Sequence, residues 1–522
     1  MKANNNLLRW VHLGLIVVVF IISFRYIFNE KLDLNGDNAA YIELARNIAQ
    51  GHGFTNETLD GAWHPHSHFP VGYPFILSLM VLCGLDNLIA FKVLNGLFLL
   101  GGAILFYFLL TRHTKNAHLA FVCALLTVMS PHVLKFATMA MSEMSFLFFM
   151  ILSMWALSRS GEEKKPFGPF LVVAALGAAA CYYLRAVGAA VLFANLVFYL
   201  FRREWKRAAV GTGISVVAIL PWMIRNRLAG VSRDYLMPIL AKNPWRPEEG
   251  NIASVGEFFQ KIWTNLDETA LSGYRHILFP NWQGYGNGPS STMTLILGGI
   301  ILLLVLYGLW NTGKMRFALE ALFVANIGFL LLWNGGNGVR YVTPFIPFLF
   351  LGFWNGVYSL LRWLLRKKWD LDARGWVVCL VLLVVPAFLP MMTEMHQAAR
   401  QPLPPAYANY YRIAEEVNKQ SKPGHKYVVC CRKPELFKYY APKTLTTTYA
   451  RTKDSEKLVR GLMQNRVDFV VLEQLGYSST PLYLYPAITA YPELFPVVWQ
   501  LKNPDTYLLR FDREKAAAVL GE

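Results

Sequence analysis

The first residue that could do chemistry is Asp37. It lies in the polar segment Asn35-Gly-Asp-Asn38, directly before an amphipathic helix predicted over about 38–49. A carboxylate placed beside a reacting hydroxyl acts as a general base. The same carboxylate could instead cap the helix by accepting its first backbone N–H groups. From the residues alone capping is favoured, because caps are common and catalytic carboxylates are rare.

Three histidines follow in the same region, at 64, 66 and 68. In an extended segment, residues two apart face the same way, so His64, His66 and His68 could hold a divalent metal. Pro65 and Pro70 interrupt regular extension, however, and the spacing fixes no acidic ligand. A metal site is therefore the less favoured interpretation. His68 could instead donate to a phosphate, or it could only pack.

Four more ionisable residues lie at or near the ends of apolar segments. Glu143 begins one such segment, where a carboxylate also suits the helix dipole. Arg185, Arg340 and Lys92 are predicted on the outer side, against the usual bias of basic residues toward the cytoplasm. Ionisable groups near a membrane are costly, and arginine grips phosphate through two N–H groups. These residues thus indicate either an anion site or contacts with lipid headgroups.

The chain that must position these residues is too apolar for a soluble enzyme. It has 522 residues, of which 55% are hydrophobic and 16% charged, against about 25% charged in an average soluble domain. Its 15 Trp, 25 Tyr and 35 Phe exclude a disordered chain. Six cysteines in this length exclude a secreted disulfide scaffold. The predicted fold class is a polytopic α-helical membrane protein.

Eleven apolar runs approach the length of about 20 residues that crosses a bilayer. They lie near 7–28, 86–110, 118–136, 143–158, 168–184, 186–201, 208–224, 292–311, 317–333, 344–361 and 375–392. The first run lacks a cleavage site and is predicted to be an uncleaved helix that enters from the cytoplasm. The apolar stretch 73–85 is shorter and is predicted to lie on the outer surface.

The basic residues agree with this arrangement. The segments predicted to be cytoplasmic hold 18 Lys or Arg and five Asp or Glu, as the positive-inside rule requires. The net charge of +17 then reflects topology and anionic lipid. No basic, aromatic-rich stripe indicates nucleic acid as a partner. An odd number of spans places three regions outside, namely a first loop 29–85, a loop 225–291 and a tail 393–522.

The tail has the character of a soluble domain that follows a membrane domain over 1–392. Strands predicted at 426–431, 444–449 and 467–472 alternate with helices at 434–440 and 455–464. This alternation indicates a small α/β domain. Cys430 and Cys431 are neighbours in the first strand and should face opposite sides. The tail has no phosphate-binding glycine motif, so a structural role is favoured over a lid or acceptor-docking role.

Short motifs run in a fixed order along residues 1–350. They are Gly36-Asp37, Tyr41…Leu44-Ala45, Gly51-His-Gly-Phe54, Phe69-Pro-Val-Gly-Tyr-Pro74, Lys92…Leu94-Asn95, Ser130-Pro131, Ser142-Glu143, Leu184-Arg185-Ala186, Pro221-Trp222…Arg225-Asn226 and Arg340-Tyr341…Pro344. This order resembles polyprenyl-phosphate-dependent glycosyltransferases of the C-type membrane fold, in the branch of aminoarabinose transferases and protein O-mannosyltransferases. The chain departs from that family at His68, often Lys or Arg, and at Ala186, usually Pro. Protein mannosyltransferases also carry an acidic residue where this chain has Asn38, which weakens the expectation of a protein acceptor.

The resemblance implies a sugar donor linked to undecaprenyl phosphate, on the periplasmic face of a bacterial inner membrane. The acceptor would be lipid A or lipopolysaccharide, another glycan or a protein. Asp37 would be the general base of a single inverting displacement, and Glu143 would orient the acceptor or assist Asp37. Cations would stabilise the leaving phosphate, and the candidates are Arg185, Arg340, Lys92 and His68. Contacts with donor or acceptor are expected from Tyr41, His52, His64, His66, Tyr73 and Tyr341.

With the resemblance added, catalysis outweighs capping for Asp37. No cofactor is implied with certainty, and the need for a divalent metal stays open. A carrier or flippase for a glycolipid is the competing class of function, and a membrane scaffold whose tail binds partners is a third. The predicted spans show neither paired Gly/Pro-broken segments in matching halves nor many charges at mid-membrane, which speaks against a carrier. Replacing Asp37 by Asn should separate an enzyme from the other two classes.

Overall fold

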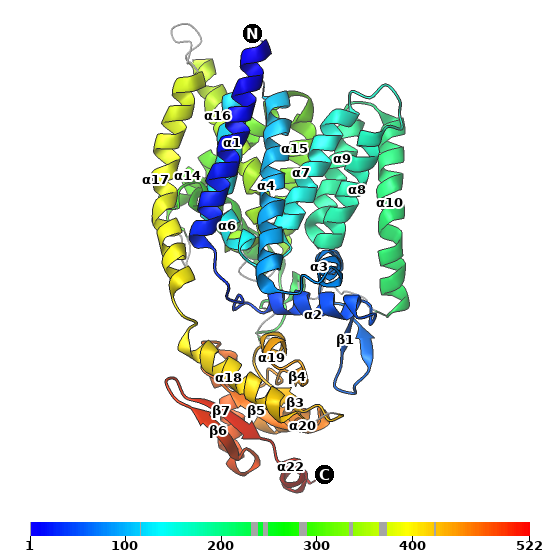
Figure 1. Cartoon of the computed structure of the whole chain (residues 1–522), viewed down its shortest axis with the longest axis vertical. Coiled ribbons are helices and arrows are strands. Elements are labelled where there is room, and N and C mark those ends of the chain that lie inside the picture. Colours follow the sequence, from blue (N-terminus) through cyan, green and yellow to red (C-terminus); the bar gives the residue numbers. More distant parts are fainter. Residues whose placement is uncertain are drawn as a thin grey trace.

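The computed structural model describes residues 2–114, 116–230, 239–243, 249–280, 290–333, 338–364, 373–421 and 424–521. It shows a helical bundle with a small α/β domain at one end (Figure 1). The N-terminal helix starts at the end of the bundle that is far from this domain. The predicted fold class is confirmed.

Each of the eleven predicted apolar runs is helical. The helices of the bundle are α1 (Lys2–Ile27), α4 (Leu88–His113), α5 (Ala117–Met129), α6 (Pro131–Ala137), α7 (Glu143–Ser160), α8 (Pro169–Leu184), α9 (Ala189–Phe201), α10 (Trp205–Leu228), α14 (Thr292–Trp310), α15 (Arg316–Leu332), α16 (Ile346–Leu364) and α17 (Ala373–Arg400). In the described part of the chain, six helices are long and apolar enough to cross a membrane, or seven when α5 and α6 count as one. The predicted domain boundary at 392 falls inside α17.

The predicted run 118–136 is bent by 55° between α5 and α6. The break lies at Ser130-Pro131, because proline lacks the backbone N–H that a continuous helix needs and keeps the preceding residue out of the helical conformation. After α6 the chain turns through residues 138–142 and enters α7 at Glu143. The bend thus places the start of α7 near the end of the bundle that carries the α/β domain.

Two short helices lie across that end of the bundle, α2 (Asp37–Ala49) and α3 (Gly72–Leu82) (Figure 1). The helix α3 confirms the prediction that the short apolar stretch does not cross. Its first residue, Gly72, lets α3 approach α8, since a side chain there would lie 2.6 Å from the carbonyl oxygen of Tyr183. Between α2 and α3 the chain forms an antiparallel hairpin of β1 (Thr55–Glu57) and β2 (Trp63–Pro65).

The region 225–291 is partly helical rather than an open loop. The helix α10 continues to Leu228, and later come α12 (Val255–Leu266), a π-helix (Asp267–Leu271) and α13 (Ser272–Leu278). Three large apolar residues on α12, Val255, Phe259 and Trp263, are exposed. They are four residues apart and therefore share one helix face, which is the pattern of a helix at a membrane interface.

The C-terminal domain contains α18 (Pro405–Gln420), α19 (Pro434–Tyr440), α20 (Ser455–Gln464), α21 (Tyr485–Ala490) and α22 (Arg513–Leu520). Its sheet has the order β4 (Leu445–Thr447), β3 (Val428–Cys430), β5 (Phe469–Leu472), β7 (Thr506–Arg510) and β6 (Val497–Leu501). The strands β4, β3 and β5 are parallel, whereas β7 and β6 are antiparallel. All five predicted elements of the tail are confirmed, and β6 and β7 were not predicted.

The two adjacent cysteines face opposite sides of the sheet, as predicted. Cys431 packs in a cluster with Leu436, Phe437 and the tyrosines of α18, which is continuous with the core of the bundle. Cys430 packs in a separate cluster with Leu458 and Val459 of α20. The sheet is therefore covered by helices on both faces, as expected for an α/β domain.

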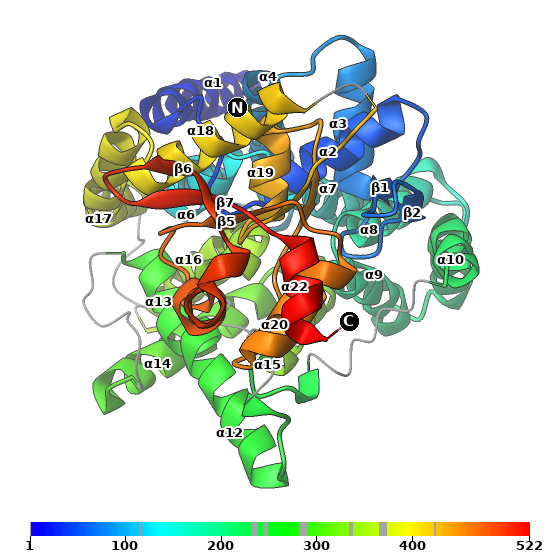
Figure 2. The same ribbon diagram turned by 90° about the horizontal axis from the view of Figure 1, so that it is seen from below.

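Lysines of the C-terminal domain hold it against the region between α1 and α3. Lys438 on α19 pairs with Glu43 on α2 at 3.2 Å, and Lys426 before β3 pairs with Glu57 of the hairpin. Lys433 donates to the carbonyl oxygen of Asn35 at 2.8 Å. Figure 2 shows α19 beside α2 in the view from below.

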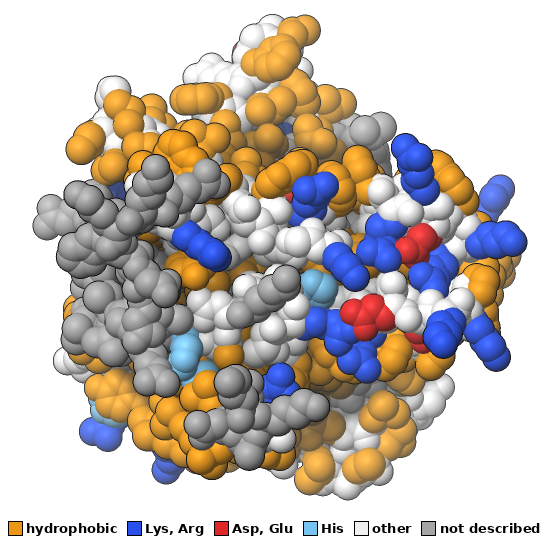
Figure 3. Space-filling view, turned by 90° about the horizontal axis from the view of Figure 1, so that it is seen from above, with side chains coloured by type: hydrophobic (Ala, Val, Ile, Leu, Met, Phe, Trp, Pro, Cys, Tyr) orange, Lys and Arg blue, Asp and Glu red, His pale blue; other side chains and the backbone are white. Residues whose placement is uncertain are grey.

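Basic side chains gather on the opposite end of the bundle (Figure 3). Helix ends on that side carry Arg112, Arg159, Arg202 and Arg207. A gathering of basic residues at one end of the bundle is what the positive-inside rule predicts for a cytoplasmic face.

Candidate active site

The segment before α2 places Asp37 at the helix start. An Asx turn forms where the side chain of Asp33 accepts the backbone N–H of Asn35 at 2.9 Å. Gly36 follows with φ of +98°, a conformation that favours glycine. Gly36 therefore occupies the N-cap position, and Asp37 is the first residue of α2. Asp37 is therefore not the N-cap of α2, and its Oδ2 lies within hydrogen-bond distance of Arg340 and Asn35 instead.

Glu143 is the first residue of α7 and its side chain is fully buried. The turn that leads to it is fixed by Asn95 on α4, whose amide donates to the carbonyl oxygens of Met139 and Met141. Ser142 occupies the N-cap position without a side-chain capping bond. Like Asp37, Glu143 directs a carboxylate oxygen at an arginine side chain.

Arg340 joins the two carboxylates. It lies in a short 3-10 helix, Gly338–Tyr341. Its Nη2 is 2.7 Å from Oδ2 of Asp37, and its Nε is 2.9 Å from Oε1 of Glu143. The three residues are brought together from segments 197 and 303 residues apart in sequence.

Arg185 completes a cluster of four charged residues, which we call the Asp37 quartet: Asp37, Glu143, Arg185 and Arg340. Arg185 ends α8 in an extended conformation, and its Nη1 is 2.8 Å from Oε1 of Glu143. The same nitrogen is 3.2 Å from the hydroxyl of Ser142. Both guanidinium groups lie over the ring of Tyr341, at 5.4 Å for Arg185 and 5.8 Å for Arg340, within the range of cation–π attraction.

The four formal charges of the Asp37 quartet cancel, and burial differs among its members. Glu143 is fully buried, whereas the side chains of Asp37 and Arg340 are 27% and 24% exposed. Burial alone would lower the pKa of Arg340, but the carboxylates of Glu143 and Asp37 outweigh it and raise the pKa above its usual range. Arg340 is therefore permanently charged. Asp37 is the carboxylate that a ligand can reach.

Tyr41 and Tyr73 form a buried layer behind the quartet. Their rings meet edge to face at 5.2 Å, and Phe69 packs on Tyr41 at 4.6 Å. Both tyrosines are at least 96% buried. Burial raises the pKa of Tyr41 to about 12. Arg185 lowers this pKa in part, whereas the carboxylates of Glu143 and Asp37 raise it further. Their position suits support of the quartet more than direct contact with a ligand.

Lys92 lies apart from the quartet in the described structure. Its ammonium donates to the carbonyl oxygens of Asn29 and Lys31 and to the side-chain oxygen of Asn29, at 2.6–3.2 Å. Three acceptors use all three N–H bonds of an ammonium group. Lys92 therefore fixes the start of the first loop. It also borders a cavity of 490 Å³ between α1, α6 and the end of α17, which is also lined by Lys31 and Lys135.

The histidines of the first loop are separated from each other. His64 pairs with Asp60 at 3.2 Å on the surface, and His66 bonds to Asn56 and accepts the N–H of Phe69. His68 is exposed and touches the ring of Phe69, and His52 stacks on Trp63 at 3.9 Å. Within the described ranges, no three His, Cys, Asp or Glu side chains are grouped to hold a metal ion. The first-loop histidines thus have no common ligand position in the structure.

Several solved structures share the overall fold of this chain. ArnT from Cupriavidus metallidurans in the apo state has a TM-score of 0.59 and 14% identity, over 98% of this chain and 99% of that chain. The same protein bound to undecaprenyl phosphate has a TM-score of 0.59 and 13% identity, over 96% and 98%. The archaeal oligosaccharyltransferase AglB from Archaeoglobus fulgidus, in complex with an inhibitory peptide and a dolichol-phosphate, has a TM-score of 0.54 and 11% identity, over 97% and 74%.

The chain has the GT-C fold. The fold expected from the ordered motifs is thereby confirmed. No protein-family model and no curated protein sequence matches the chain.

Within this GT-C chain, the sequence did not single out three residues that hold the site in place. They are Asn35, whose amide lies 3.5 Å from Oδ2 of Asp37, Asn95 and Ser142. Asn95 and Ser142 belong to the ordered motifs, but a motif does not reveal that a side chain binds a backbone oxygen 46 residues away. Arg225 also has a structural role, since it donates to the carbonyl oxygens of Phe54 and His66 and thereby fixes the hairpin.

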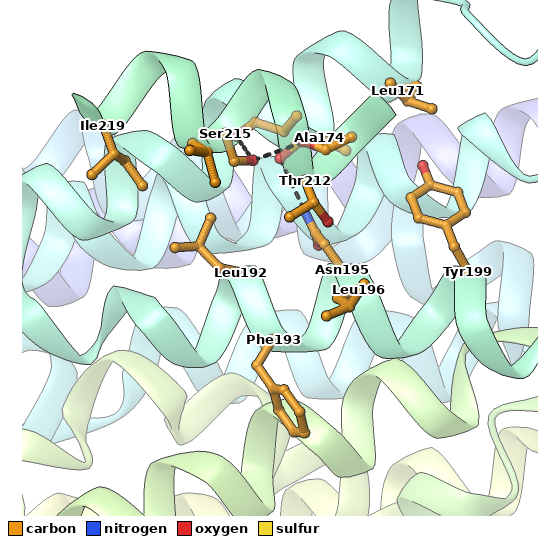
Figure 4. A pocket seen from close by; sticks show the side chains of 13 residues that line it. Leu171, Ala174, Leu192, Phe193, Asn195, Leu196, Tyr199, Thr212, Ser215 and Ile219 are labelled. Carbon is orange, nitrogen blue, oxygen red and sulfur yellow. Dashed lines mark hydrogen bonds between the residues drawn. The ribbon is translucent and has the colours of Figure 1, made fainter. Parts of the chain in front are cut away.

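The GT-C bundle also contains an apolar cavity of 160 Å³ between α8, α9 and α10, which Figure 4 shows. The polar side chains of Asn195 and Ser215 at its wall both bond to backbone oxygens of α8. No charged residue lines it. It has the character of a gap in helix packing and shares no residue with the Asp37 quartet.

Proposed function

We propose that this protein is an integral membrane glycosyltransferase of a bacterial inner membrane, acting on the periplasmic face. It transfers a sugar from an undecaprenyl-phosphate-linked donor to an acceptor of the cell envelope, such as lipid A or lipopolysaccharide, another glycan or a protein. The observation that carries the proposal is Arg340 bridging Asp37 and Glu143. This bridge places a reachable carboxylate beside two guanidinium groups at the end of a GT-C bundle.

Asp37 is suited to act as the general base. Its Oδ2 binds Arg340, while its Oδ1 accepts no hydrogen bond within the described residues. The free oxygen is available to the hydroxyl of an acceptor. In the proposed step the acceptor oxygen bonds to the anomeric carbon as the bond from that carbon to the phosphate oxygen breaks. The hydroxyl proton passes to Asp37, polyprenyl phosphate leaves, and the anomeric configuration is inverted.

The two arginines are suited to the leaving phosphate. Each guanidinium carries five N–H bonds, and Glu143, Asp37 and Ser142 use only some of them. The remaining donors are preorganised for the charge that grows on the departing oxygen. Because Glu143 is fully buried between them, we assign it to positioning Arg185 and Arg340. Lys92 and His68 are not part of this cluster, and a role for them in phosphate binding stays a prediction.

The proposal is tested on the envelope of a strain that lacks the protein. We expect mass analysis to show that a glycolipid, glycan or glycoprotein loses one sugar residue, and that the wild-type gene restores it. A synthetic donor of known anomeric configuration should give the opposite anomer in the product, as determined by NMR. An unchanged envelope, retention of the anomeric configuration, or restoration by Asp37→Asn would refute the proposal and favour a carrier or scaffold.

A further inference from the structure

The strand order of the C-terminal sheet reverses at β3, because the chain adds β4 on one side of this strand and β5 on the other. This strand is the first along the chain and lies between β4 and β5, both parallel to it. The connection through α19 leads to β4 on one side, and the next connection, through α20, leads to β5 on the other. In open α/β sheets, ligands bind beyond the carboxyl ends of the strands at such a switch point. The loops after β3 and β5 are therefore where a ligand is expected.

These two loops bring two cations onto one aromatic ring. Arg432 and Lys433 follow β3, and Tyr477 follows β5. The guanidinium carbon of Arg432 is 4.5 Å from the centre of the Tyr477 ring, and the ammonium of Lys433 is 4.8 Å from it. The hydroxyl of Tyr477 lies 3.3 Å from that of Tyr407 on α18, which fixes the ring. The loops at the switch point thus hold two cations against one positioned ring.

The guanidinium of Arg432 has donors to spare. Its Nε is buried, and no described residue accepts a hydrogen bond from it. The nearby carboxylate of Glu473 is buried, and its two oxygens accept from the backbone N–H of Leu475 and the hydroxyl of Thr480 instead. A planar guanidinium with free N–H groups grips phosphate or carboxylate through two parallel hydrogen bonds. An anion at this position would relieve the repulsion between the two adjacent cations.

The switch point adjoins the segment that carries Asp37. Lys433 donates to the carbonyl oxygen of Asn35 at 2.8 Å. A side-chain carbon built at Gly36 would lie 3.9 Å from the chain of Lys433 and 3.7 Å from the carboxylate of Glu435. Asp37 is the next residue, and α19 lies beside α2 (Figures 1 and 2). A group bound beside Lys433 would therefore lie on the C-terminal-domain side of the segment that carries Asp37.

We propose that Arg432 and Lys433 bind the acidic group, a phosphate or a carboxylate, of a saccharide acceptor, and so bring its hydroxyl toward Asp37. The identity of the ligand as the acceptor rests on the proposed function, whereas the binding of an acidic sugar does not. The C-terminal domain then selects charged acceptors, and the membrane domain carries out the transfer.

Direct binding to the full-length protein in detergent tests the proposal. Glucose 6-phosphate, glucuronate and uncharged glucose are titrated separately and observed by saturation-transfer NMR. We expect at least one of the two acidic sugars to bind and glucose not to bind. Arg432→Gln, which keeps a polar side chain with N–H donors and removes the charge, should weaken binding at least tenfold. Arg510→Gln is the matched control, because Arg510 is exposed and pairs with Phe469 at the amino end of β5, away from the carboxyl ends of β3 and β5.

A difference between the two acidic sugars identifies the acidic group. Failure of both to bind, equal binding of glucose, or unchanged binding by Arg432→Gln would overturn the proposal. Should Arg432→Gln lower the thermal midpoint more than the control does, Arg432→Lys replaces it. Arg432→Lys keeps the charge without the planar fork and should bind with intermediate affinity, and wild-type affinity would count against the proposal. Asp37→Asn should bind the acidic sugar like the wild type, so loss of transfer and loss of binding are separable.

Discussion

Replacing Asp37 by Asn removes the proposed base and leaves its surroundings nearly unchanged. Asparagine keeps an oxygen that accepts from Arg340, so the 2.7 Å contact persists without its charge. Because both side chains are about a quarter exposed, the lost ion pair should cost at most about 1 kcal/mol of folding stability. General-base catalysis is worth roughly 10²–10⁴-fold, which corresponds to about 3–5 kcal/mol of the activation barrier. The loss should therefore fall on turnover.

The assay follows transfer of a labelled sugar from a synthetic polyprenyl-phosphate donor to envelope acceptor in proteoliposomes. Binding of the donor and the thermal midpoint are measured in the same preparation. Asp86→Asn is the matched control, because Asp86 makes an ion pair of 2.9 Å with Arg46 and has a similar exposed fraction of 37%. A variant Asp37→Asn that keeps more than about a tenth of wild-type turnover would contradict the base assignment. Equal losses in Asp37→Asn and Asp86→Asn would do the same.

Four further predictions follow from the contacts described. Arg340→Lys should lower kcat about 10–100-fold at nearly constant stability, since one ammonium cannot reproduce two separate guanidinium contacts, and unchanged kcat in the transfer assay would exclude the bridge. Lys92→Met should speed amide hydrogen exchange over residues 29–36, and unaltered exchange would show that the lysine does not fix this segment. His66→Ala should lower the thermal midpoint, whereas His64→Ala, an exposed position, should not, and equal effects would contradict the separation of the two rings. Burial raises the pKa of Glu473 above its ordinary 4.5, so the folded state holds this proton more tightly than the unfolded state does. The free energy of unfolding should therefore fall as pH rises above about 4.5. Glu473→Gln should reduce this pH dependence in thermal unfolding measured between pH 4 and pH 8.

The helices could be predicted because a bilayer imposes a simple rule on the sequence. Each predicted apolar run is helical, because continuous apolar character favours a helix whose backbone groups are all paired within it. The strands β6 and β7 were not predicted, because their stability comes from the pairing of β7 with β5 and of β6 with β7 rather than from a pattern of their own. The bend at Ser130-Pro131 lies inside one predicted run. The sequence contains the proline, but it does not determine the angle between the two helices.

The site was only partly predictable for a related reason. Glu143, Arg185 and Arg340 stand out as charges at the ends of apolar runs, and Asp37 stands out as a carboxylate before an amphipathic helix. Their mutual contacts, however, depend on how the helices pack. The residues alone favoured a cap role for Asp37, but Gly36, with its positive φ, occupies the N-cap position. Lys92 lies one turn inside α4 and binds the carbonyl oxygens of Asn29 and Lys31. These partners likewise depend on how the first loop folds over the helix.

The three lysines that grip the region between α1 and α3 limit how such proteins can be recombined. Lys426, Lys433 and Lys438 meet Glu57, Asn35 and Glu43 across the junction of the two domains. A chimera joined within α17 would keep one parent's lysines and inherit the other parent's acidic partners. A chimera that takes the C-terminal domain from one parent should therefore take residues 35–57 from the same parent, because the two segments form one packing unit.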